Sequence, residues 1–288
     1  MGKDTEIEVL EWLKKWGEAR EDVRAIILTS SRSNPNAQID RFSDYDPILV
    51  ITDIKRYIDE RWLGDFGKVL TVYRDPIRIE YGFERFTRVT QYEDGLKIDF
   101  SLWPVGLLKS ILELPALPEY LDIGYRIILD KDNLTVSLKA PTYKAYIPIP
   151  PTESEYLTLI EEHFSEANYV AKHLCRGDLI PAKYILDTTM KFEDLRKMLE
   201  WQIEIDHNWS IKPGAYGKGL QKYIKPEIWD KFVKTYVGTD TEENWKALFD
   251  TIDLFREVAE EVGKALGYTY PVELYERSVR YLKKIKIS

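Results

Sequence analysis

Two carboxylates, Asp44 and Asp46, come just before an apolar run at residues 48–51 and are well suited to chemistry. Residues two apart at the start of a strand share one face, so the two side chains should point the same way. Neighbouring carboxylates repel unless a positive charge lies between them, and Mg²⁺ binds such carboxylates together with substrate phosphate oxygens. The pair therefore predicts a site that handles a nucleotide.

Two further residues extend this pattern. Ser31 follows a strand expected at 23–30, at a turn where its hydroxyl and backbone N–H could meet a terminal phosphate. Residues 86–102 have the pattern of a hairpin, and alternation in its second arm places Asp99 on the face opposite the core. Three carboxylates beside a serine turn are typical of a nucleotidyltransferase palm, where catalysis is positioning and charge neutralisation by metal.

The elements that must position these residues follow from hydrophobic periodicity. An amphipathic helix is expected at residues 5–19, and the strand at 23–30 is apolar on both faces, as in a central strand covered by helices. A polar loop at 30–41 leads to a second strand at 47–52.

The sequence pattern changes in the middle of the chain, from strand-like segments to long helical periodicities. Residues 141–151 include Pro148, Pro150 and Pro151, which cannot continue a helix and predict an extended linker. We therefore expect a nucleotidyltransferase domain at 1–147 and a helical substrate-binding domain at 148–288. Helices are expected at 153–175, 179–208, 226–236, 241–266 and 272–285. The expected fold class is α/β (α+β), with a mixed sheet in the first domain and a helical bundle in the second.

Composition limits the partners. The 288 residues carry 49 acidic and 41 basic side chains, a net charge of −8, which argues against a nucleic-acid backbone and favours a cationic small substrate. Neither a targeting segment nor a long apolar run is present, so we expect a cytoplasmic protein without a membrane partner. The single cysteine, Cys175, is expected to be a buried structural thiol, and the three histidines lack metal-ligand spacing.

Several segments, in order, resemble the aminoglycoside 6-adenylyltransferases, the streptomycin adenylyltransferase family of the nucleotidyltransferase superfamily. Residues 28–36 read Leu-Thr-Ser-Ser-Arg-Ser-Asn-Pro-Asn, and residues 42–46 read Phe-Ser-Asp-Tyr-Asp. Further similar segments are 50–53, 62–68, 92–100, 127–132 and 198–201. The resemblance covers about residues 20–270.

The resemblance implies Mg²⁺-dependent transfer of AMP from ATP, as co-substrate, to a hydroxyl of a cationic aminoglycoside, most simply the 6-hydroxyl of streptomycin. It implies that Mg²⁺ binds Asp44, Asp46 and Asp99, with Asp99 acting as a ligand, as the base, or as both. The implied nucleotide contacts are Ser30, Ser31, Arg32, Tyr216, Lys218 and Lys222. Separately from the resemblance, the acids Asp187, Glu193, Asp194 and Glu200 could include some that pair with guanidinium or ammonium groups of a drug, while most are expected to form a solvated helix face.

Two alternatives remain open. The acceptor could be another small molecule or a protein side chain. A nucleotide-binding module that has lost catalysis is also consistent with Ser30, because the family motif normally has glycine there. Glycine at that position lets the backbone approach the phosphates closely and adopt unusual dihedral angles.

Overall fold

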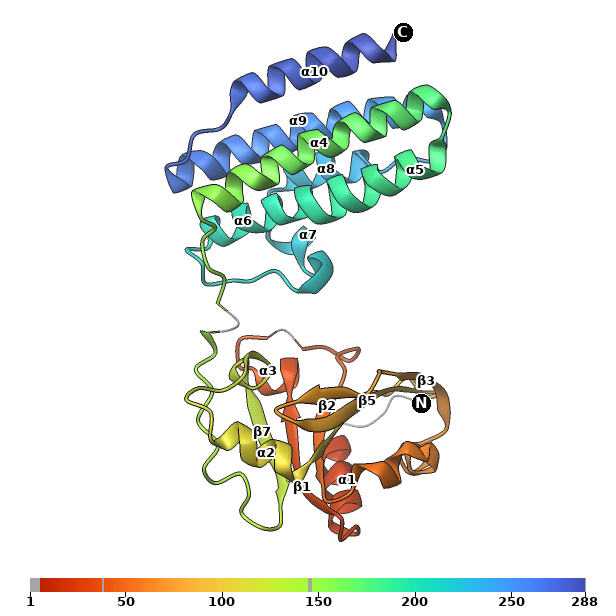
Figure 1. Cartoon of the computed structure of the whole chain (residues 1–288), viewed down its shortest axis with the longest axis vertical. Coiled ribbons are helices and arrows are strands. Elements are labelled where there is room, and N and C mark those ends of the chain that lie inside the picture. The colour runs from red at the N-terminus through yellow and green to blue at the C-terminus, as the bar shows by residue number, and fades with distance from the viewer. Residues whose placement is uncertain (1–5, 38, 145–146, 288) are drawn as a thin grey trace. The chain divides into compact units, whose positions relative to one another are not determined.

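The computed structural model describes residues 6–37, 39–144 and 147–287 (Figure 1). It divides the chain into two compact units, Met1–Tyr146 and Ile147–Ser288. The linker expected at 141–151 includes residues 145 and 146, which lie outside the described residues. The sequence analysis placed a domain boundary between residues 147 and 148, and the roles of the two domains remain predictions.

A seven-stranded mixed sheet forms the N-terminal unit, in the order β3-β5-β6-β2-β1-β7 with β4 paired to β5. Strands β2 and β6 pair in parallel, whereas β1 is antiparallel to both β2 and β7. The strands are β1 (Val23–Thr29), β2 (Asp46–Ile51), β3 (Val69–Arg74), β4 (Arg78–Glu80), β5 (Phe83–Tyr92), β6 (Lys97–Pro104) and β7 (Tyr125–Asp130). The helices are α1 (Glu6–Glu18), η1 (Ser30–Ser33), η2 (Ile54–Ile58), η3 (Glu60–Phe66), α2 (Val105–Leu112) and α3 (Glu119–Asp122).

Both faces of the central strands are buried, which explains their continuous apolar sequence. In β2, Leu49 and Ile51 belong to the core that includes residues of α1, η2 and η3. Ile48 and Val50, which point the other way, belong to the core that includes residues of α2. The expectation of a mixed sheet built on apolar central strands is therefore confirmed.

The C-terminal unit is helical, as expected (Figure 1). Helix α4 begins with a capping box between Thr152 and Glu155 and ends at Gly177 in the left-handed conformation. The core of this unit is formed mainly by residues of α4, of α9 and of the helical segment 185–206. The elements are α4 (Glu153–Arg176), α5 (Leu179–Tyr184), η5 (Ile185–Leu195), α6 (Arg196–Asp206), η6 (Ala215–Gly217), α7 (Leu220–Tyr223), α8 (Pro226–Lys234), α9 (Thr241–Leu266) and α10 (Val272–Lys286).

The helix expected at 179–208 is continuous but not uniform. Between α5 and α6, the 11 residues of η5 form a π-helix. Such π-helical turns are rare and are frequently found at functional sites.

Cys175 differs from expectation, because it is exposed rather than buried. Its thiol donates to the carbonyl oxygen of Ile285 at 3.3 Å. Among the described residues, no helix combines the length and the apolar character that crossing a bilayer requires.

Candidate functional site

The approach of β2 to β6 brings the predicted carboxylates together. Tyr45 lies opposite Ile98 in a parallel bridge, and the backbone N–H of Asp99 donates to the carbonyl oxygen of Tyr45 at 2.8 Å. Tyr45 and Ile98 are both buried in the core on the α1 side of the sheet. Since alternate strand residues point to opposite faces, Asp44, Asp46 and Asp99 share the other face.

A lysine lies between two of these carboxylates. The Nζ of Lys97 donates to the Oδ2 of Asp99 at 3.0 Å and also forms an ion pair with the Oδ2 of Asp44. Burial opposes the charged ammonium, but hydrogen bonds to the two carboxylates outweigh it and raise the pKa of Lys97. The sequence analysis did not predict this residue, although its position two residues before Asp99 on one strand was a signal for it.

The second carboxylate of the pair is the most strongly perturbed. Burial, followed by the charges of Asp99 and Asp44, raises the pKa of Asp46 to about 6. Lys97 and a hydrogen bond from Ser30 oppose that increase. The site therefore concentrates more negative charge than its own lysine neutralises, which favours a further cation.

The donor set is chemically suited to Mg²⁺, which prefers carboxylate oxygens and phosphate oxygens. Within the part of the chain that the structure describes, the Oδ1 of Asp99 is enclosed and has no hydrogen-bond partner, and burial raises the pKa of this carboxyl. Within residues 6–37, 39–144 and 147–287, no group of three or more His, Cys, Asp or Glu side chains is arranged closely enough to hold a metal ion. The assignment of Asp44, Asp46 and Asp99 as metal ligands stays a prediction.

The serine turn lies next to this face. Ser30 begins the 3-10 turn η1 with a φ of 63°, in the left-handed region that favours glycine. The preceding residue, Thr29, donates its hydroxyl to the carbonyl oxygen of Asp46 at 3.0 Å and so ties the turn to β2. The structure therefore gives a physical reason for the glycine of the family motif and places Ser30 beside Asp46.

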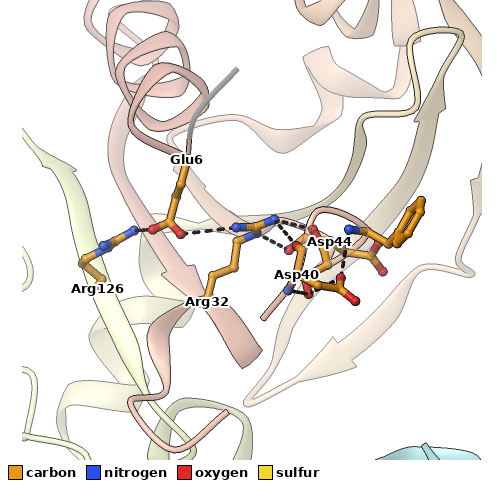
Figure 2. Close-up of polar contacts among 7 residues, drawn as sticks. Glu6, Arg32, Asp40, Asp44 and Arg126 are labelled. Carbon is orange, nitrogen blue, oxygen red and sulfur yellow. Dashed lines mark hydrogen bonds and ion pairs between the residues drawn. The ribbon is translucent and has the colours of Figure 1, made fainter. Parts of the chain in front are cut away.

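The guanidinium of Arg32, a predicted nucleotide contact, lies between Glu6 and the loop that carries Asp44 (Figure 2). Its Nε donates to the carbonyl oxygen of Asp44 at 3.0 Å, and its Nη2 donates to that of Ser43 at 2.7 Å. Its Nη1 donates to the carboxylate of Glu6 at 3.2 Å, and that carboxylate also accepts from Arg126 at 2.6 Å (Figure 2). In this conformation Arg32 holds the loop that carries Asp44, so its role as a nucleotide contact stays a prediction.

The other predicted nucleotide contacts belong to the C-terminal unit. Tyr216 is 81% exposed, lies parallel to the ring of Phe192 at 6.1 Å, and has a φ of 60°. Lys218, on the turn after η6, and Lys222, on α7, are both exposed. All three side chains are exposed. Their roles as nucleotide contacts remain predictions.

Most of the acids considered for drug binding have protein partners. Asp187 forms ion pairs with Lys183 and Lys191. Buried Asp194 contacts His163 at 3.3 Å. Glu200 pairs with Arg196, and Glu193 is exposed.

The structure reveals a further acid, Glu204, that the sequence analysis did not consider. Its side chain is buried on α6, one turn after Glu200. Burial, followed by the charge of Glu200, raises its pKa to about 7. Its four-residue spacing from Glu200 was a signal, but burial could not be inferred from that spacing alone.

Comparison with known proteins adds an independent result. The sequence model of a family described as streptomycin adenylyltransferase matches residues 4–285. The chain is 28% identical over 278 residues to an aminoglycoside 6-adenylyltransferase from Campylobacter jejuni, covering 96% of this chain and 93% of that protein. It is 28% identical over 255 residues to one from Bacillus subtilis, covering 87% of each. A crystal structure of an aminoglycoside 6-adenyltransferase from Bacillus subtilis aligns over 99% of this chain and all of that one, with 24% identity and a TM-score of 0.48.

Proposed function

The chain belongs to the streptomycin adenylyltransferase family of nucleotidyltransferases, and from this premise we propose that it transfers AMP from ATP to a hydroxyl of an aminoglycoside. The acceptor that we propose is the 6-hydroxyl of streptomycin. This goes beyond family membership, because the relatives named above are about 28% identical to this chain.

One observation carries the proposal: Asp44, Asp46 and Asp99 share one face of the sheet beside the turn at Ser30. These acids come from segments more than 50 residues apart in the sequence. Nucleotidyl transfer needs negative charge to be neutralised and the α-phosphorus to be aligned with the attacking oxygen. A convergent set of hard oxygen donors at the end of a strand supports that chemistry.

The residues of the chain have separate tasks in the proposed reaction. Asp44 and Asp46 would hold Mg²⁺, which when bound supplies charge neutralisation at the phosphates. Ser31, on the turn after β1, would contact a terminal phosphate with its hydroxyl or backbone N–H. Arg32 would keep Asp44 in place through the carbonyl oxygens of the preceding loop. The acceptor hydroxyl then attacks the α-phosphorus directly and pyrophosphate leaves, without a covalent enzyme intermediate.

Two roles fit Asp99. Its carboxylate could bind the same cation as the aspartate pair, or it could accept the proton of the acceptor hydroxyl. A carboxylate that ligates Mg²⁺ is less basic, so the two roles compete. Metal binding measured separately from turnover in Asp99→Asn distinguishes them, since loss of the base alone leaves the metal affinity intact.

The decisive experiment is mass spectrometry of streptomycin after incubation with ATP, Mg²⁺ and the protein. We expect a product heavier by one adenylyl group, with release of pyrophosphate. A panel of other aminoglycosides tests the choice of drug. No product with any aminoglycoside, combined with turnover on another alcohol or on a protein, would replace this proposal with the alternative acceptor.

A second candidate function, a nucleotide-binding module without catalysis, is favoured by one observation, the left-handed conformation of Ser30. A side chain there crowds the backbone that should approach the phosphates. ATP binding without any product, both in the wild type and in Ser30→Gly, would support this candidate. Recovery of transfer in Ser30→Gly would instead identify an impaired enzyme.

A further inference from the structure

Glu204 is placed where an acid is costly. The residue is 7% exposed, and in the described part of the chain its carboxylate has no hydrogen-bond or ion-pair partner. Glu200, one helical turn earlier, acts on it with a like charge. An uncompensated charge in such a position is costly, and it is neutralised by a shift of its pKa unless a partner of opposite charge compensates it.

The end of helix α6 adds a third cost. The backbone N–H groups of Asn208 and Trp209 donate to the carbonyl oxygens of Ile205 at 3.0 Å and of Glu204 at 2.6 Å, and both residues have positive φ. These two bonds form the cap in which a helix ends on a left-handed residue. Glu204 therefore lies in the last turn of α6, where the helix dipole is negative and favours a cation. That turn contains no basic residue.

The nearby cations do not meet this need. Arg196, one turn before Glu200, is paired with Glu200 and also donates to the carbonyl oxygen of Phe192. Lys212, on the loop after α6, is exposed and acts on Glu204 only through its charge. Among the described residues, the carboxylate oxygens of Glu204 are not fully enclosed, so they keep contact with solvent.

We propose that Glu204, assisted by Glu200, binds a cationic group of the acceptor substrate, a guanidinium or an ammonium. The inference rests on the proposed function and adds the residues that recognise the acceptor. A bound cation offsets all three costs together: the burial of the charge, the repulsion from Glu200 and the unfavourable end of the helix dipole. A guanidinium can also donate two parallel hydrogen bonds to one carboxylate.

The test compares two variants that each remove one negative charge from a helix of the C-terminal unit. Glu204→Gln removes the buried acid of α6, and Glu161→Gln removes an exposed acid of α4 that has no ion pair among the described residues. Calorimetric titration with streptomycin should give a loss of affinity of about tenfold or more in Glu204→Gln, because a desolvated ion pair is broken. The affinity of Glu161→Gln should stay within about twofold of the wild type, as for an exposed charge.

Two additional measurements separate recognition from a structural role. Glu204→Gln should raise the KM for streptomycin and leave the KM for ATP unchanged, with a native circular dichroism spectrum. Glu204→Asp, which keeps the charge on a shorter side chain, should recover part of the lost affinity. Loss of ATP binding together with streptomycin binding in Glu204→Gln would overturn the inference.

The outcomes also separate this inference from the proposed function. If the wild type binds and adenylylates streptomycin and Glu204→Gln does so equally well, the inference is wrong and the proposed function stands. If the wild type neither binds nor modifies any aminoglycoside, both are wrong. Selective loss in Glu204→Gln supports both.

Discussion

The Nζ of Lys97 lies 3.0 Å from the Oδ2 of Asp99, two residues further along β6, and the same ammonium contacts Asp44 on the neighbouring chain segment. Lys97 thus occupies the position where a cation would be expected between these carboxylates. Any metal ion that binds between Asp44 and Asp99 must displace this ammonium or share the carboxylates with it.

We expect Lys97→Met to increase the affinity for Mn²⁺, used as a spectroscopic substitute for Mg²⁺, by about tenfold without nucleotide, because the competing internal cation is gone. Titration followed by electron paramagnetic resonance measures this. The metal-free variant should also have a lower Tm, since three carboxylates then repel each other. Lys109→Met, at an exposed position on α2, is the control. Unchanged Mn²⁺ affinity in Lys97→Met would show that the lysine does not compete.

Asp44→Asn and Asp46→Asn should each reduce AMP transfer by about 100-fold or more, because each removes a charged oxygen donor from the proposed metal site. The amide has nearly the same shape, so the circular dichroism spectrum and Tm should remain close to those of the wild type. Glu84→Gln removes an exposed acid of β5 and should retain full activity. Undiminished transfer in either aspartate variant would mean that the metal site is misplaced.

Arg32→Ala should lower the free energy of unfolding by about 2–4 kcal/mol, because it removes a buried charge that has several partners. Only 8% of the Arg32 side chain is exposed. Urea denaturation measures the change, and transfer activity should fall with it as the loop of Asp44 loosens. The exposed Arg41, on the same loop, is the control, and Arg41→Ala should change stability by less than about 0.5 kcal/mol. A stable, fully active Arg32→Ala variant would contradict the positioning role.

Ser30→Gly should raise the free energy of unfolding by about 0.5–1 kcal/mol. Relief of the left-handed conformation stabilises the folded state by about 1–2 kcal/mol. Loss of the hydrogen bond from Ser30 to Asp46 offsets part of that stabilisation. Ser33→Gly, in the same turn, is the matched control. It should be destabilising, because the Ser33 hydroxyl donates to the carbonyl oxygen of Leu28 at 2.9 Å. Equal destabilisation of both variants in thermal melts would contradict the assignment of strain to Ser30.

The stability of the wild type should fall as pH rises from 5 to 8, and Glu204→Gln should show less of this fall. The pKa of Glu204 is raised from 4.5 to about 7 in the folded protein. Between these two values the folded state binds more protons than the unfolded state, so stability is lost as pH rises. The difference amounts to about 2–3 kcal/mol. Parallel pH profiles for the wild type and Glu204→Gln in thermal melts would show that Glu204 is not perturbed.

The sequence by itself determined the features that depend on local periodicity. An alternating pattern predicted that Asp44 and Asp46 share a face and that Asp99 points away from the core. Continuous apolar strands and long helical periods predicted the mixed sheet and the helical unit. Each of these inferences depends on residues within a few positions of each other, where backbone geometry alone fixes the direction of a side chain.

Tertiary structure alone decided which side chains meet. Lys97 contacts Asp44 because two segments more than 50 residues apart pair in register, and Arg32 turns inward because α1 brings Glu6 to it. Glu204 is an ordinary helix acid in the sequence. Its pKa is raised because the side chain is buried in the folded protein and Glu200 lies one helical turn away. Desolvation and charge depend on distances through space, which no local pattern in a sequence specifies.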